Sequence, residues 1–128
     1  MIVLAALMAA AFNGPDSAPA LDAVKTCNRA AMTDLAKAEP HRRTEFAAAA
    51  YAEQQAIARE RAALLAQQVS EATPAGKASL DLALAQLDVR QRQLDDAHAV
   101  ESSWRAMFDE MRADYLANCA QTKGGKVQ

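Results

Sequence analysis

Two cysteines are the residues of this 128-residue chain best suited to chemistry. A cysteine pair can exchange disulfides, bind a metal ion or form a structural disulfide. Redox pairs and zinc sites use short spacings such as C-x-x-C, often with clustered histidines, whereas Cys27 and Cys119 lie far apart in the chain. We therefore interpret Cys27 and Cys119 as a structural disulfide, which requires an oxidising compartment.

The histidines and the adjacent carboxylates do not form a convincing acid–base or metal site. His41 and His98 do not meet in the hairpin described below, and neighbours such as Asp95-Asp96 or Asp109-Glu110 point about 100° apart on a helix. The chain contains no G-x-S-x-G motif and no glycine-rich phosphate loop. We expect no catalytic residue, no metal and no cofactor, and hence a protein that is not an enzyme.

Two arginines beside a proline offer a contact surface instead. Arg42 and Arg43 follow Pro40-His41, and Trp104 is the single tryptophan. In the hairpin, Arg42 lies opposite Trp104, within reach of a cation–π contact. This contact can stabilise the fold, or the patch can bind a partner, so Arg42, Arg43 and Trp104 are candidate partner-contact residues.

The cysteines are centred on a turn. Their midpoint falls in Thr73-Pro74-Ala75-Gly76, the strongest turn signal between two long helical stretches. Because helices rise by the same amount per residue, a chain that folds back here brings Cys27 level with Cys119. The sequence therefore predicts an all-α fold: a long antiparallel, coiled-coil-like helical hairpin whose open end is closed by the disulfide.

The second arm carries the clearest periodicity. Six residues recur every seven positions, with a second column between them, and a 3.5-residue spacing predicts supercoiling with a partner helix. The first column contains Leu80, Leu87, Leu94, Glu101, Phe108 and Tyr115, and the second contains Leu84, Gln91, His98, Trp104, Met111 and the pair Asn118/Cys119.

The first arm is interrupted at Glu39-Pro40, where proline removes a backbone donor. If the chain folded back at Pro40, the two cysteines would lie roughly 39 Å apart. We therefore expect one long arm that is kinked near Pro40. The predicted domain covers residues 21–122, with arm one at 21–70, a turn at 71–78, arm two at 79–121 and a flexible tail at 123–128.

The N-terminal segment has features of an export signal. Residues 1–12 are almost wholly apolar, and Ala18-Pro19-Ala20 offers an A-x-A cleavage pattern, so residues 1–20 are a predicted signal peptide. The segment lacks a basic beginning. The alternatives are an uncleaved anchor, a start placed too far downstream, or a plain apolar end of a helix. Twelve apolar residues are too few to span a bilayer comfortably. We expect a periplasmic or secreted protein with no membrane insertion after signal removal.

Composition and charge narrow the expected partners. The chain has 14 basic and 16 acidic residues, a net charge of −2, which gives no electrostatic basis for binding nucleic acid. A two-helix seam provides no enclosed pocket, while long amphipathic faces suit binding to another protein, including a second copy in a homodimer. We expect a chaperone-like or scaffold protein. The alternative is a small inhibitor or regulator of a secreted enzyme that acts through the hairpin tip, residues 71–77.

Overall fold

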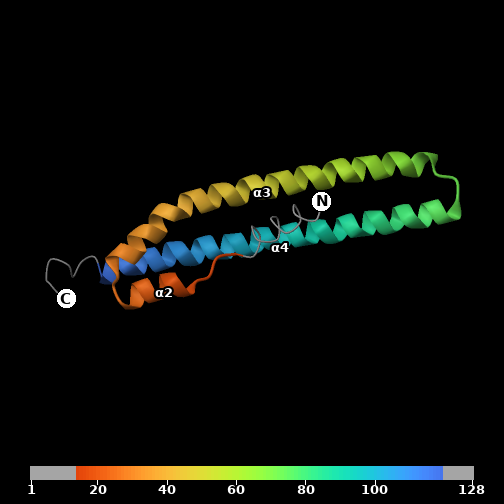
Figure 1. Cartoon of the computed structure of the whole chain (residues 1–128). Helices are drawn as coiled ribbons and strands as arrows, with labels where there is room; N and C mark the ends of the chain where they lie inside the picture. Colours follow the sequence, from red (N-terminus) through yellow and green to blue (C-terminus); the bar gives the residue numbers. More distant parts are fainter. Residues whose placement is uncertain (1–13, 120–128) are drawn as a thin grey trace.

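The computed structural model describes residues 14–119, which form three helices. Helix α2 spans Ala18–Lys25, α3 spans Arg29–Ser70 and α4 spans Pro74–Asn118. The long helices α3 and α4 run antiparallel as a hairpin, and the short α2 lies beside them at one end (Figure 1). The predicted all-α helical hairpin is confirmed.

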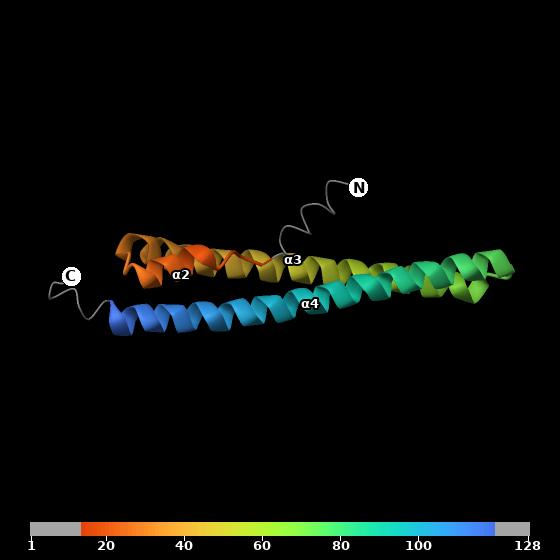
Figure 2. The same ribbon diagram turned by 90° about the horizontal axis from the view of Figure 1, so that it is seen from below.

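A disulfide bond between Cys27 and Cys119 closes this end, with the two Cα atoms 5.3 Å apart. We call it the disulfide end, and we call the turn Glu71–Thr73 at the opposite end the tip. Side chains in the middle of the hairpin follow the register that the cysteines predict, since the Gln54 and Gln91 amides bond to each other at 3.0 Å. The two long ribbons cross in Figure 2, as helices that coil around each other do.

The seven-residue column predicted for α4 forms the core of the hairpin. All six of its members are buried, including the carboxylate-bearing Glu101. The second column behaves differently, because Ala97 is buried in place of the predicted His98. Ala97 packs in the core with Phe46, Ala50, Ile57 and Leu94. Towards the disulfide end, α2 packs on Trp104 and Met111, which lie seven and fourteen residues further along α4.

The first arm begins at Arg29 rather than at residue 21, because the chain reverses at residues 26–28. Cys27 takes a positive φ of 51°, which lets the backbone turn sharply without a glycine. The Asn28 amide donates to the Ala23 carbonyl at 2.9 Å, and the Asn28 side chain accepts from the Ala31 amide at 3.1 Å, so it caps α3. The disulfide end is therefore a three-helix assembly, whereas the rest is a two-helix hairpin.

Helix α2 packs through its smallest residues. Ala20 and Ala23 are each 1% exposed, whereas the larger Leu21 is 42% exposed. The predicted cleavage pattern Ala18-Pro19-Ala20 forms the first turn of this helix. Residues 1–13 of the predicted signal peptide and the predicted tail, 123–128, lie outside the described residues.

Pro40 lies inside α3, which continues through it as a single helix. Without an N–H, Pro40 cannot bond to the carbonyl one turn earlier, and such positions bend helices. Figure 1 shows α3 curving in its part nearest the disulfide end, where this proline lies. The bend brings the start of α3 towards α2 and α4.

The tip turn is shorter than the predicted 71–78, because α4 already begins at Pro74. Proline suits the first position of a helix, where its missing donor is not needed. The Thr73 hydroxyl accepts from the Gly76 amide at 3.0 Å and caps the helix, and it donates to the Glu71 carboxylate at 2.7 Å. Packing weakens towards this tip, since no residue of α3 after Ile57 is buried.

Candidate functional site

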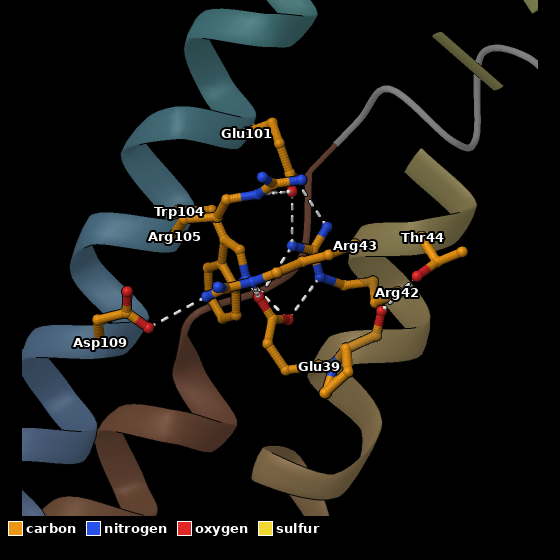
Figure 3. A network of polar contacts seen from close by, with 9 residues as sticks. Glu39, Arg42, Arg43, Thr44, Glu101, Trp104, Arg105 and Asp109 are labelled. Atoms are coloured by element: carbon orange, nitrogen blue, oxygen red, sulfur yellow. Dashed lines mark hydrogen bonds and ion pairs between the residues drawn. The ribbon is translucent and has the colours of Figure 1, made fainter. Parts of the chain in front are cut away.

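The largest polar assembly of the described residues joins the bend of α3 to α4 (Figure 3). It brings together the three predicted contact residues with four further charged side chains. We call it the charged cluster; its members are Glu39, Arg42, Arg43, Glu101, Trp104, Arg105 and Asp109.

Glu39 is the centre of the charged cluster and is only 6% exposed. Its two carboxylate oxygens accept from Arg42 and Arg43, at 2.6 Å in each case for the Nε donor. The Trp104 indole N–H donates to the same carboxylate, at 3.0 Å for Oε2. Burial alone would raise the pKa of the Glu39 carboxyl, but these hydrogen bonds lower it to about 2.

Arg42 bridges two buried carboxylates on different helices. Besides its bonds to Glu39, its guanidinium donates to Glu101 at 2.7 and 3.0 Å. It also lies over Trp104, 5.7 Å from the ring centroid, which confirms the predicted cation–π contact. Hydrogen bonds to Glu39 and Glu101 raise the pKa of Arg42, so its charge is permanent.

The outer arginines continue the cluster towards solvent. Arg43 donates to Asp109 at 3.1 Å as well as to Glu39. Arg105 donates to Glu101 at 2.6 Å from one turn along α4. Within residues 14–119, no buried side-chain oxygen or nitrogen lacks a hydrogen-bond partner.

This arrangement is suited to holding two helices in register rather than to proton transfer. A carboxyl with a pKa of about 2 stays ionised at neutral pH, and its lone pairs are already occupied by three donors. Arg42 and Trp104 are therefore placed between the helices. The Arg105 side chain is 40% exposed, against 27% for Arg42 and 29% for Arg43.

Sequence reasoning found the arginines and the tryptophan but not the acidic centre. The signal for Glu101 was present, because it occupies a position of the buried α4 column and a buried charge requires a partner. Glu39 lies seven residues before the buried Phe46 and seven after the buried Met32. That spacing could have identified it as the partner.

The two histidines do not come together in the structure. His41 is exposed and contacts the Glu45 carboxylate at 3.0 Å, while His98 meets the edge of Phe46 with ring centroids 5.5 Å apart. In the described part of the chain, no group of three or more histidine, cysteine or acidic residues is arranged to hold a metal ion.

Two shallow apolar grooves lie on the hairpin. One, of about 390 Å³, is near Trp104, where Gly14 and Pro15 cross α4 beside Val100 and Met107. The other, of about 350 Å³, lies between α3 and α4 near the tip. We call the second one the tip groove; its lining residues are Glu60, Ala63, Leu64, Ala83, Gln86, Leu87 and Arg90.

The fold and the charged cluster define an all-α hairpin with a covalently closed end and a buried ionic contact between its arms. Comparisons with protein-family models, curated proteins and solved structures found no match for this chain. Among residues 14–119, none of the helices has the length and apolar character that crossing a membrane requires.

Proposed function

We propose that this chain is an exported, non-enzymatic helical module that binds another protein in a chaperone-like or scaffold role. The observation that carries the proposal is apolar side chains exposed along both arms of a covalently closed rod. They are Tyr51, Leu65, Val69, Leu82, Val89, Val100, Met107 and Leu116.

Apolar side chains exposed along a helix favour recognition of another helix or of an extended apolar segment. Tyr51 is 68% exposed and Val69 90% exposed on the outer side of α3. The charged cluster supports a non-enzymatic role, because its acidic centre, Glu39, is ion-paired with Arg42 and Arg43 and has no free lone pair for proton transfer. The disulfide is compatible with an oxidising compartment such as the periplasm or the exterior.

Site-specific photo-cross-linking in the exported fraction tests this function. A photoreactive residue at Tyr51 or Leu116 is expected to capture a different protein. The control is a photoreactive residue at Asp34, an exposed polar position of α3. Capture that is equal at all three positions, or export that fails, contradicts the proposal.

A hydrogen-bonded tip favours the second candidate function, a small inhibitor or regulator that presents the tip to a secreted enzyme. The Glu71 carboxylate accepts from the Thr73 amide at 2.9 Å and from the Thr73 hydroxyl, so the turn is held in one conformation. Alanine substitutions at the non-alanine positions of residues 71–77 distinguish the two functions; these are Glu71, Thr73, Pro74, Gly76 and Lys77. A partner lost by tip substitutions, but kept after Tyr51→Glu, supports the inhibitor.

A further inference from the structure

The two cysteines of the disulfide have different surroundings. Cys119 is 6% exposed and packs in a core cluster with Ala23, Met32 and Tyr115, which come from all three helices. Cys27 is exposed and lies in the short reversal between α2 and α3, beside the end of α4 (Figure 1). One cysteine of the pair is therefore part of the core, whereas the other lies at the surface.

The backbone of α2 contacts both cysteines. The Val24 carbonyl accepts from the Cys27 amide at 3.3 Å and lies 3.6 Å from the Cys119 sulfur. In the reduced chain, the Cys119 thiol can donate to this carbonyl. The Asn28 amide donates to the Ala23 carbonyl at 2.9 Å, which holds the reversal on α2. These contacts keep the two cysteines together without requiring the covalent bond.

The difference in exposure determines which cysteine reacts first. A disulfide bond forms by attack of a thiolate on the sulfur of another disulfide, through a mixed disulfide, and the rate depends on access to the attacking sulfur. A cysteine in apolar surroundings is also less reactive, because burial disfavours the thiolate. Cys27 is accessible to another molecule, whereas the core cluster encloses Cys119.

We propose that Cys27 is the site at which this chain reacts with a disulfide oxidant, and that Cys119 closes the bond afterwards. The oxidant is either a small disulfide or the active-site disulfide of a thiol oxidoreductase. This inference does not depend on the proposed chaperone-like or scaffold role, because it concerns how the disulfide end is closed.

The reaction has two steps. The Cys27 thiolate attacks one oxidant sulfur, so that a Cys27–oxidant bond forms, the disulfide of the oxidant breaks and its other sulfur leaves as a thiolate. The Cys119 thiolate then attacks the Cys27 sulfur, and the remaining oxidant sulfur leaves as a thiolate. The protons of the two cysteine thiols pass through solvent to the two departing thiolates. Two cysteines are thereby oxidised, and one oxidant disulfide is reduced to two thiols.

The same asymmetry slows the reverse reaction. A reducing thiolate reaches the exposed Cys27 sulfur, but Cys119 must then leave as a thiolate inside the apolar cluster. A charge in such surroundings is unfavourable. Attack on the Cys119 sulfur would release the exposed Cys27, but the core cluster blocks the approach. Reduction of the folded chain should therefore be slow and pass through a mixed disulfide at Cys27.

Two full-length variants provide a matched pair, because each keeps one of the two thiols. Cys119→Ser and Cys27→Ser are incubated with oxidised glutathione in native buffer, and intact mass spectrometry follows the glutathione adduct. Cys119→Ser, which keeps Cys27, should react at least about tenfold faster than Cys27→Ser, because Cys119 is buried. In urea the two rates should become similar. Circular dichroism checks that both variants are helical in native buffer.

The wild-type chain tests the order of the steps. The reduced chain is treated briefly with oxidised glutathione and quenched with acid, and peptide mapping of the singly modified monomer should locate glutathione on Cys27. The oxidised chain is then mixed with a thiol oxidoreductase whose second active-site cysteine is replaced by serine. A mixed disulfide with this enzyme at Cys27 identifies a protein oxidant, whereas reaction with glutathione alone identifies a small disulfide.

Equal rates for the two variants in native buffer, a faster reaction of Cys119, or no reaction of Cys27 overturns the proposal. Glutathione found first on Cys119 of the wild-type chain does so as well. These measurements use purified protein, so they do not depend on photo-cross-linking at Tyr51 and Leu116. Failure of this inference is therefore distinguishable from failure of the proposed function.

Discussion

Glu39 shows how a buried charge can be retained in a thin helical seam. Removing one partner from a buried ion pair is costly, because the remaining charges lose their compensation. Glu39 compensates two arginines and an indole N–H at once, so it determines how α3 meets α4. The bend at the neighbouring Pro40 places these groups between α3 and α4. The charged cluster therefore fixes the alignment of the two helices as well as stabilising the fold.

Protonation of Glu39 at low pH should therefore lower the free energy of unfolding. The folded-state pKa of about 2 lies below the reference value of 4.5, so its contribution is fully present above pH 4.5 and is lost as the pH falls towards 2. Urea unfolding at pH 7, 4 and 2.5 should show this decrease. Glu39→Gln should lower the unfolding free energy at pH 7 by roughly 3 kcal/mol and flatten its pH dependence.

Glu45→Gln is the matched control for this measurement. Glu45 is on the same helix, but its side chain is 68% exposed and contacts the exposed His41 imidazole. A substitution there should change stability by less than about 0.5 kcal/mol. An equal effect of the two variants would show that the pH dependence does not come from the buried carboxylate.

At the scale of single elements, α2 depends on small residues. Ala20 and Ala23 leave no space for a larger side chain, because both are 1% exposed. Ala20→Leu should force α2 away from Trp104 and cost about 1–3 kcal/mol. Hydrogen exchange should then become faster in α2, while residues 57–90 at the tip keep their protection. Leu21→Ala, at a 42% exposed position of the same helix, should leave α2 in place.

The caps of the long helices make a second element-scale prediction. Thr73 caps α4 through its hydroxyl, so Thr73→Ala should cost about 1 kcal/mol, whereas Thr73→Ser keeps the acceptor and should cost much less. Chemical denaturation of the two variants provides the measurement. If both lose the same stability, the tip is held by its proline rather than by the cap.

The helical pattern predicts most of this element structure from sequence alone. The α4 column and the centred cysteines suffice for the hairpin and its register, because both depend on regular spacing. The reversal at residues 26–28 could not be seen in the same way, since it contains neither glycine nor proline. Its only signal was Asn28, a good N-cap residue. Pro40 suggested the stronger interruption, yet packing and the charged cluster hold α3 together across it.

Only part of the charged cluster could be predicted from the sequence, because its other part depends on how three helices pack. Arg42 and Trp104 could be matched by register, which needs only residue numbers and helical rise. The involvement of Glu39 depends on the direction in which α3 bends and on α2 packing against Trp104. Both are properties of three packed helices, and a single-helix pattern does not contain them.

At the scale of the whole molecule, the disulfide should contribute a large part of the stability. It closes a loop with a sequence separation of 92 residues, for which the chain-entropy model gives roughly 4–5 kcal/mol. Cys27→Ser with Cys119→Ser should lower the melting temperature and free α2 first. Non-reducing mass spectrometry of the exported protein should find the bond within one chain. Free thiols, or a bond only between chains, would contradict the closed hairpin.

Covalent closure also has a mechanical consequence. Force applied to the two termini would peel an ordinary helical hairpin apart from its open end. Here the pull passes directly from Cys27 to Cys119, so the chain between them carries almost no load. In a single-molecule stretching experiment, only α2 should yield while the bond is intact. After reduction of the disulfide bond, the hairpin should also unfold under force. This adds the extended length of 92 residues, roughly 300 Å, to the length gained from α2. The disulfide bond therefore keeps the hairpin between Cys27 and Cys119 folded while force is applied to the two termini.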